Sequence, residues 1–302
     1  MTARSSESTG ATVVVDSHIH FWDTQRLDYP WLQTVPELER PFLPEDLDVG
    51  EIEVAAMVFV QANPVWNQVE DETAWILQLG SRDSRIRGLV AGVPLDRGGA
   101  AVEAWLEALT TTPGVAGVRQ LIQDEPAGFA LSTDFVGAVQ LAGSVGLVVD
   151  LCVRQHQIAE ITELVDRCPE VTFVLDHLGK PDIRGGARTE WASDLSRLGR
   201  LENVRCKLSG LTTEAGGAND ARTITDYLRC GIDVFGPGRC MFGSDWPNAG
   251  LHISYAGWVA LVAEAASGLN SADRARIMTG TAREVYARAW TRSLVGAPEA
   301  YD

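Results

Sequence analysis

The chain has 302 residues, of which 45% are apolar and 22% charged, and its formal net charge is −16 at pH 7. The apolar content is sufficient for a large core, and the length allows either two average domains or one α/β barrel. The negative charge argues against nucleic acid or an anionic membrane as a partner, because both require clustered lysine and arginine.

The first eleven residues, MTARSSESTGA, contain no apolar run, so we expect a disordered tail at 1–11 and no secretory signal. No stretch reaches the roughly 20 apolar residues that a membrane helix needs. The five cysteines are scattered and form no C-x-x-C pattern, which is typical of free thiols in a reducing compartment. The sequence therefore predicts a cytoplasmic protein whose folded domain covers residues 12–302.

Short apolar runs alternate with amphipathic helical patterns along the whole chain. The predicted strands are residues 12–18, 54–61, 86–93, 115–120, 147–152, 171–177, 204–208 and 240–245. Helical spacing is found at residues 69–79, 100–109, 158–165 and 220–235, and Ser271 is expected to cap a terminal helix. This alternation, without a change of composition, predicts a single α/β domain, a (β/α)8 TIM barrel.

A doubly wound open sheet is the alternative to the barrel. Against it, no G-x-G-x-x-G motif follows the first predicted strand. A long aromatic loop, residues 21–44, stands there instead.

The first predicted strand ends in two histidines two positions apart, in the sequence VVVDSHIHFW. Residues i and i+2 of a strand project from the same face, so His18 and His20 should point the same way. Taken alone, the pair fits either the edge of a core or half of a metal or acid/base site.

The other predicted strand ends favour the site, because barrel enzymes build their active sites at the carboxyl ends of the strands. Three of the five histidines lie at such ends, and a fourth follows one shortly after. The further polar residues found there are Gln61, Arg119, Gln120, Arg154, His156, Asp176, His177, Lys207, Ser209, Ser244 and Asp245.

Several motifs resemble those of the amidohydrolase superfamily: HIH at 18–20, LDHLGKP at 175–181 and FGSDWP at 242–247. DYPWL, GVRQ, DEP and CKLSGL are similar to the amidohydrolase-2 lactonases, a group that includes L-fuconolactonase and 2-pyrone-4,6-dicarboxylate lactonase. The resemblance spans nearly the whole chain. It implies an amidohydrolase-type barrel that opens the lactone ring of a sugar acid or a related carboxylic acid.

The resemblance also implies a ligand set for one divalent ion, with zinc expected: His18, His20, His177 and Asp245. Related lactonases include metal-dependent and metal-free members, so both readings stay open. Two-metal members of the superfamily carry a lysine on strand four and a histidine at the end of strand five. Arg119 and the sequence DLCVRQH stand at those positions here, so we expect no binuclear centre.

Opening a lactone requires an activated water, stabilisation of charge on the carbonyl oxygen and protonation of the leaving alkoxide. Asp245 is the predicted general base, because a carboxylate at the end of strand eight would face the barrel axis. His177 and Arg119 are the other predicted catalytic residues, and an ion pair within the fold is the alternative for Arg119. Because neighbours alternate in a strand, Asp176 is expected to face away from His177.

Further residues are predicted to contact the substrate: Arg119, Gln61, Trp22, Trp246, Arg154, His156 and Lys207. A solvated rim position is the alternative for Arg154, His156 and Lys207. Tyr29 and Trp31 are expected mainly to pack the first loop onto the barrel. Lys180 is expected in a loop within reach of a ligand.

The predicted partner is a small-molecule lactone. A homodimer is compatible with this class, although no self-complementary face is evident in the chain. Zinc-dependent, non-oxidative decarboxylation of an aromatic acid is the alternative activity, since related proteins carry it out. A barrel that only binds a ligand is a third reading, and the intact set of His18, His20, His177 and Asp245 argues against it.

Overall fold

The computed structural model describes residues 11–216 and 220–291. The predicted N-terminal tail lies outside these ranges except for Ala11, as does the part of the predicted domain beyond residue 291. Among the described helices, none is long and apolar enough to cross a membrane.

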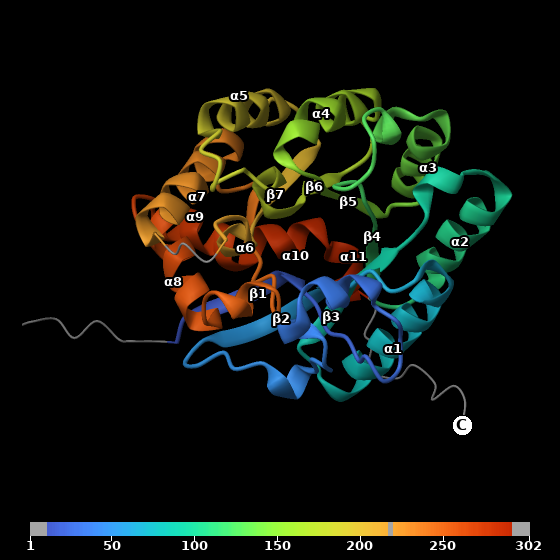
Figure 1. Cartoon of the computed structure of the whole chain (residues 1–302), viewed down its shortest axis with the longest axis horizontal. Coiled ribbons are helices and arrows are strands. Elements are labelled where there is room, and N and C mark those ends of the chain that lie inside the picture. The colour runs from blue at the N-terminus through green and yellow to red at the C-terminus, as the bar shows by residue number, and fades with distance from the viewer. Residues whose placement is uncertain (1–10, 217–219, 292–302) are drawn as a thin grey trace, which may run out of the picture.

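Eight parallel strands lie side by side in chain order and curve into a nearly closed barrel surrounded by helices (Figure 1). They are β1 (Val13–Ile19), β2 (Glu53–Val60), β3 (Ile86–Gly92), β4 (Val115–Leu121), β5 (Val148–Cys152), β6 (Phe173–Leu175), β7 (Val204–Leu208) and β8 (Cys240–Phe242). The segment after β8 joins β1, because the Asp245 amide donates to the His18 carbonyl and the His20 amide to the Trp246 carbonyl, both at 2.8 Å. The predicted (β/α)8 barrel is confirmed, and the open sheet is wrong.

Helices follow the strands and cover the outside of the barrel (Figure 1). They are α1 (Val69–Arg82), α2 (Gly99–Thr111), α3 (Thr133–Ser144), α4 (Ile158–Arg167), α5 (Arg188–Leu198), α6 (Leu211–Glu214), α7 (Ala221–Phe235), α8 (Tyr255–Ala265), α9 (Ser271–Ala275), α10 (Thr281–Val285) and α11 (Ala287–Thr291). The predicted helical segments correspond to α1, α2, α4 and α7. The cap of α9 is Asn270 rather than Ser271, since the Asn270 side chain accepts a hydrogen bond from the Asp273 amide.

Two strands end two or three residues earlier than predicted. β6 stops at Leu175 instead of residue 177, and β8 stops at Phe242 instead of residue 245. In both cases the backbone then enters the left-handed region, with φ of 52° at His177 and 56° at Asp245. The two residues that the apolar pattern assigned to strand ends therefore stand in turns.

The interior of the barrel is filled by small apolar side chains from the strands. They include Val15, Val58, Val60, Val90, Ala116, Val148, Val174 and Met241, packed with Ala282, Tyr286 and Ala289 of the C-terminal helices. Arg288 anchors these helices by donating to the carbonyls of Thr110 and Val145, which lie shortly before β4 and β5. The C-terminal segment thus closes the amino end of the barrel, and the carboxyl end stays open.

Candidate active site

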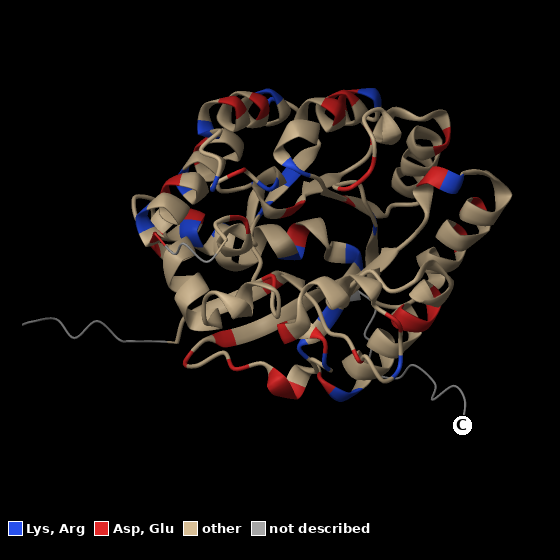
Figure 2. Ribbon diagram, viewed as in Figure 1, with Lys and Arg blue, Asp and Glu red and all other residues tan. Residues whose placement is uncertain are grey.

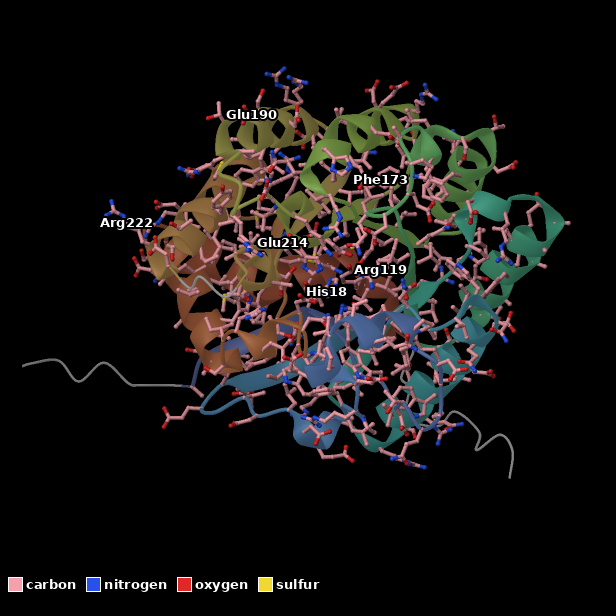
Figure 3. All side chains as sticks on the ribbon, in the orientation of Figure 1. His18, Arg119, Phe173, Glu190, Glu214 and Arg222 are labelled. Atoms are coloured by element: carbon pink, nitrogen blue, oxygen red, sulfur yellow. The ribbon has the colours of Figure 1, made fainter. Side chains whose placement is uncertain are left out.

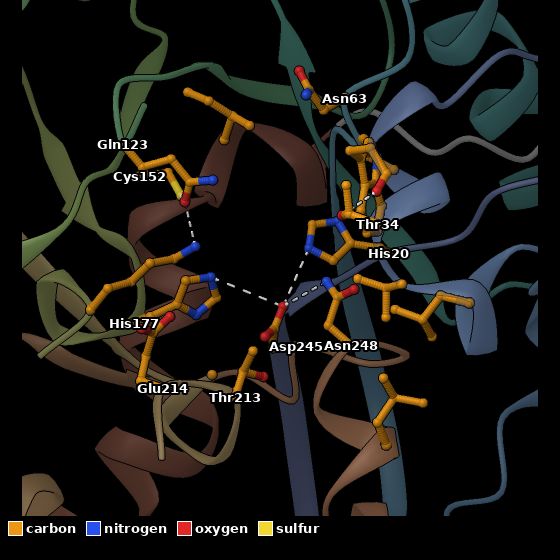
Figure 4. A pocket seen from close by; sticks show the side chains of 18 of the residues that line it. His20, Thr34, Asn63, Gln123, Cys152, His177, Thr213, Glu214, Asp245 and Asn248 are labelled. Atoms are coloured by element: carbon orange, nitrogen blue, oxygen red, sulfur yellow. Dashed lines mark hydrogen bonds and ion pairs between the residues drawn. The ribbon is translucent and has the colours of Figure 1, made fainter. Parts of the chain in front are cut away.

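A cavity of about 720 Å³ opens at the carboxyl ends of the strands (Figure 4). Side chains of β4 and β5 and of the segments directly after β1, β6 and β8 line its inner part: His20, Arg119, Leu121, Cys152, His177 and Asp245. The outer walls come from the first loop, the segment after β4 and the loops after β7 and β8. The structure thus brings five of the predicted strand-end residues together around one cavity: His20, Arg119, Arg154, His177 and Asp245.

Three imidazoles surround the carboxylate of Asp245. The Oδ1 atom of Asp245 lies 3.5 Å from His20 Nε2, 3.9 Å from His18 Nε2 and 4.0 Å from His177 Nε2. His18 and His20 also face each other, with their Nε2 atoms 3.1 Å apart. Figure 4 shows His20 and His177 pointing at Asp245 from opposite sides of the cavity.

Hydrogen bonds of the opposite ring nitrogens orient the two rings. His20 Nδ1 lies 2.7 Å from the Val60 carbonyl oxygen, which can only accept, so Nδ1 carries the proton. His18 Nδ1 lies 3.1 Å from a carboxylate oxygen of Asp176, which can accept from it, and 3.1 Å from Lys207 Nζ, which can only donate. Both rings therefore turn Nε2 toward Asp245.

His177 reaches the cavity through an unusual backbone. Residues 177 to 180 all have positive φ, so the chain makes a left-handed turn directly after β6. Such φ values are costly for residues other than glycine and persist where the surroundings enforce them. Here His177 Nδ1 lies 2.8 Å from Ser209 Oγ. The turn lets Asp176 and His177, although adjacent, both face the barrel axis, so the expectation that Asp176 faces away is wrong.

Burial sets the charge state of the cluster. It lowers the pKa of His18 and His20, and it lowers the pKa of His177 to about 4, so these imidazoles are neutral at pH 7. Burial alone would raise the pKa of Asp245, but the interactions with the three imidazoles hold that pKa below its usual range. The cluster therefore combines an ionised carboxylate with neutral nitrogen ligands.

A layer of paired charges lies beneath the cluster, inside the barrel. Lys207 Nζ donates to Asp150 Oδ2 at 2.5 Å and to Asp176 Oδ1 at 3.1 Å. Arg119 donates to Asp176 Oδ2 at 2.9 Å, and the hydroxyl of Tyr286 donates to Asp150 at 3.0 Å. Figure 3 shows His18 and Arg119 near the centre of the barrel. These contacts fix Asp176, which in turn orients His18.

The residues present fit one divalent metal ion. Nitrogen and carboxylate donors from His18, His20 and Asp245 converge closely enough to hold one, and His177 faces the same carboxylate oxygen. A second set of possible metal ligands consists of His18, Asp176 and His177. Asp176 is already bound by Arg119 and Lys207, so the first group is the better ligand set.

Not all predicted substrate contacts line the cavity. Arg119 and Arg154 do, and Arg154 is exposed at the rim, where it donates to Asp124 at 3.0 Å. His156 is exposed outside the cavity lining, and Lys207 is fully buried beneath it. The side chain of Gln61 is also buried and does not line the cavity. The backbone carbonyl of Gln61 contributes to the site indirectly, because it accepts a hydrogen bond from Arg119 Nη2 at 2.5 Å.

Trp22 and Trp31 of the first loop stand in the reverse of their predicted positions, and Trp246 also lies outside the cavity. Trp22 is fully buried and donates to the carbonyls of Leu38 and Arg40, so it packs the loop. Trp246 packs against Phe21 and Phe42 and does not line the cavity. Trp31 does line it, and its indole donates to the Ala62 carbonyl at 2.8 Å.

Several lining residues were not predicted as site residues. They include Gln123, Cys152, Thr213, Glu214 and Asn248, whereas Lys180, expected in a loop within reach of a ligand, lines the cavity as well. Most stand in loops or short helices, where no periodic pattern marks them. Gln123 comes two residues after β4 and Asn248 three after Asp245, so closeness to a strand end is the one signal that could have indicated them.

The model of the family described as amidohydrolase matches residues 15–288, and the chain belongs to this family. It is similar to L-fucono-1,5-lactonase of Burkholderia multivorans, at 35% identity over 289 residues, covering 90% of this chain and 95% of that protein. The crystal structure of an amidohydrolase from Burkholderia multivorans with bound zinc is 33% identical, with a TM-score of 0.78, covering 91% of this chain and 99% of that one.

A 2,6-dihydroxybenzoate decarboxylase shares the fold at greater distance. Its structure is 14% identical, with a TM-score of 0.60, and covers 92% of this chain and 99% of that one. This likeness concerns the fold alone.

Proposed function

We propose that the protein is a lactonase that opens the lactone ring of a sugar acid by attack of a water molecule. The observation that carries this proposal is the buried Asp245 carboxylate among three neutral imidazoles, at the inner end of the cavity. The lactonase with which the chain shares 35% identity supports the same activity. The decarboxylase is the more distant relative, so decarboxylation is not favoured.

Asp245 acts as the general base in this scheme. Its carboxylate takes a proton from the water as the water oxygen bonds to the lactone carbonyl carbon. The bond between that carbon and the ring oxygen then breaks, and the proton passes to the ring oxygen to give a hydroxy acid. Base catalysis of this kind typically contributes ~10²–10⁴-fold.

Arg119 is proposed to orient the lactone. Its Nη1 and Nη2 atoms are held by Asp176 and the Gln61 carbonyl, which fixes the guanidinium plane. Its buried Nε has no hydrogen-bond partner among the described residues. Arg119 borders the cavity, and its planar guanidinium suits the carbonyl and hydroxyl oxygens of a lactone. Arg154 is proposed to contact the substrate at the rim.

A single zinc ion is the proposed cofactor, held by His18, His20, His177 and Asp245. Bound there, it would lower the pKa of a water molecule and polarise the carbonyl. The neutral state of the imidazoles favours metal binding, since an imidazolium cannot act as a ligand. Arg119 stands where two-metal relatives carry a lysine, so the proposed centre is mononuclear.

The proposed setting is the cytoplasm. All five cysteines are free thiols, and four of them are buried, as expected in a reducing compartment.

A pH-indicator assay against a panel of five- and six-membered aldonolactones tests the activity. We expect acid release from a few lactones, with loss of turnover in chelator and recovery on addition of zinc. Turnover that is indifferent to chelator would contradict the metal and leave the Asp245 mechanism standing. Inertness toward every lactone, with carbon dioxide released from an aromatic acid, would replace the proposal by decarboxylation.

A further inference from the structure

One lysine and two arginines line the cavity: Lys180, Arg119 and Arg154. Two of them are neutralised, because Arg119 is paired with Asp176 at 2.9 Å and Arg154 with Asp124 at 3.0 Å. Lys180 has no carboxylate within 4.0 Å among the described residues. Its Nζ donates instead to the neutral Oε1 of Gln123, at 2.5 Å (dashed line in Figure 4).

A lysine side chain ordinarily carries a positive charge at neutral pH. A partly buried ammonium without an ion-pair partner is costly unless something binds it. The cavity therefore holds one positive charge that the described residues do not pair.

The backbone places this charge next to the reacting cluster. Lys180 ends the left-handed turn that begins at His177, and the Lys180 amide donates to the His177 carbonyl at 2.9 Å. Both residues adopt positive φ, of 46° and 52°. Such backbone is retained at functional sites because it positions side chains that regular structure would separate.

Lysine is rare in this chain, which contains two lysines and 23 arginines. Lys207 lies fully buried under the cluster, and Lys180 lies in the cavity wall. Both lysines therefore belong to the site, and an amine-directed reagent has only Lys180 to reach in the cavity.

We propose that Lys180 binds the acyl oxygens of the substrate, first the lactone carbonyl oxygen and then the carboxylate of the ring-opened acid. This inference rests on the proposed lactonase activity. Lys180 keeps its three protons throughout, and the proton of the attacking water moves through Asp245 to the ring oxygen. Gln123 holds the ammonium in place through its side-chain oxygen.

Binding of the product acid separates this role from a structural one. Calorimetry with L-fuconate and turnover of L-fucono-1,5-lactone should be measured for the wild type, Lys180→Met, Lys180→Arg and Arg222→Met. Arg222 is exposed on α7, far from the cavity (Figure 3), and its replacement controls for the loss of one positive charge. Melting temperatures check that each variant folds.

We expect Lys180→Met to bind L-fuconate at least ~10-fold more weakly and to lose ~10²–10³-fold in kcat, as for removal of one oxyanion donor. Lys180→Arg should recover part of both, and Arg222→Met should match the wild type. If the wild type opens the lactone while Lys180→Met binds and reacts equally well, the role of Lys180 is refuted and the lactonase stands. If the wild type opens no lactone and binds no sugar acid, the proposed function fails and this inference fails with it.

Reductive methylation provides a test that needs no variant. Formaldehyde and cyanoborohydride modify free amines, and mass spectrometry separates Lys180 from the N-terminal amine, which serves as the internal reference. Saturating L-fuconate should slow methylation of Lys180 several-fold without slowing the reference. Equal rates with and without L-fuconate would overturn the proposal.

Discussion

Asp245 combines two properties that a general base needs, namely burial and an ionised carboxylate. Burial strengthens its interaction with a bound water, because the effective dielectric is low in the cavity. Burial alone would raise the pKa of this carboxyl group, and the interactions with His18, His20 and His177 hold that pKa below its usual range.

Replacing Asp245 by Asn should lower kcat by at least ~10²-fold with little change in melting temperature, because the amide fills the same volume without accepting the proton. Steady-state kinetics on a lactone substrate provide the measurement. Asp233→Asn on α7 is the matched control, since Asp233 is exposed and should retain full activity. Near-normal turnover of Asp245→Asn would rule it out as the base.

The left-handed turn after β6 carries both His177 and Lys180, and its geometry depends on Gly179. Gly179 has φ of +71°, and a Cβ atom there would lie 2.8 Å from Ile158 Cδ1 on α4. An added methyl group would therefore meet two obstacles, the unfavourable backbone and a close contact with a packed helix.

We expect Gly179→Ala to reduce the free energy of unfolding by about 2–4 kcal/mol, combining roughly 1 kcal/mol or more for the backbone with 1–3 kcal/mol for overpacking. Gly186→Ala isolates the backbone term, because Gly186 has φ of +75° and nothing within 4 Å of the added Cβ. Denaturant titration of both variants gives the comparison. Equal losses would show that the contact with Ile158 relaxes without cost.

The first loop is attached to α1 through a buried carboxyl group. Glu72 accepts hydrogen bonds from the Tyr29 hydroxyl at 3.2 Å and from the Ala62 amide at 3.1 Å. Burial raises its pKa from 4.5 to about 8, although these bonds and Arg119 oppose the shift. The folded protein therefore holds a proton on Glu72 that the unfolded chain releases above about pH 4.5.

This shift predicts a pH dependence of stability. Because the pKa is higher in the folded state, its stabilising effect is fully present below pH 4.5 and is lost as pH rises through about 8. Relative to Glu72→Gln, the wild type should lose up to about 1.4 kcal/mol per pH unit in this window. Chemical denaturation of both proteins at pH 5 and pH 8 measures the difference, and a gap that moves in favour of the wild type would contradict the assignment.

The barrel could be predicted because the spacing of apolar residues distinguishes strands from helices. The site residues could be predicted because they lie at the ends of the predicted strands. Apolar runs mark the strands, and polar residues interrupt these runs where the strands end. The turn at His177 could not be predicted, since strand alternation says nothing about a left-handed backbone. Trp22 and Trp31 belong to the same aromatic loop, so only the packed loop distinguishes the buried side chain from the one that lines the cavity.

At the scale of the whole molecule, charge is distributed very unevenly. Aspartate and glutamate positions are spread over the outer helices and loops (Figure 2), in keeping with the net charge of −16. Inside the barrel, Asp150 and Asp176 are balanced by Lys207 and Arg119. Buried charges need such pairing, since removal of one partner leaves an uncompensated charge in a low dielectric.

The hydroxyl of Tyr286 contributes to this balance from the opposite end of the barrel. Tyr286→Phe should destabilise the fold by about 1–2 kcal/mol, because a buried hydrogen bond to Asp150 is lost. It should also lower kcat more than it changes KM. Asp150 holds Lys207, and Lys207 in turn holds Asp176, so the loss would disturb the support of the site. Tyr29→Phe removes a comparable bond to Glu72 outside the barrel and should cost stability alone. A normal kcat for Tyr286→Phe would show that the buried charge pairs keep their arrangement without the Tyr286 hydrogen bond.

The position of Tyr286 after the last strand also bears on biosynthesis. A ribosome releases the strands in order, so β1 to β8 are available for pairing before α10 and α11 emerge. Until Tyr286 arrives, Asp150 lacks its hydroxyl partner and the amino end of the barrel is open to water. The cluster around Asp245, although built from residues as early as His18, thus acquires its full support only after all eight strands have been made.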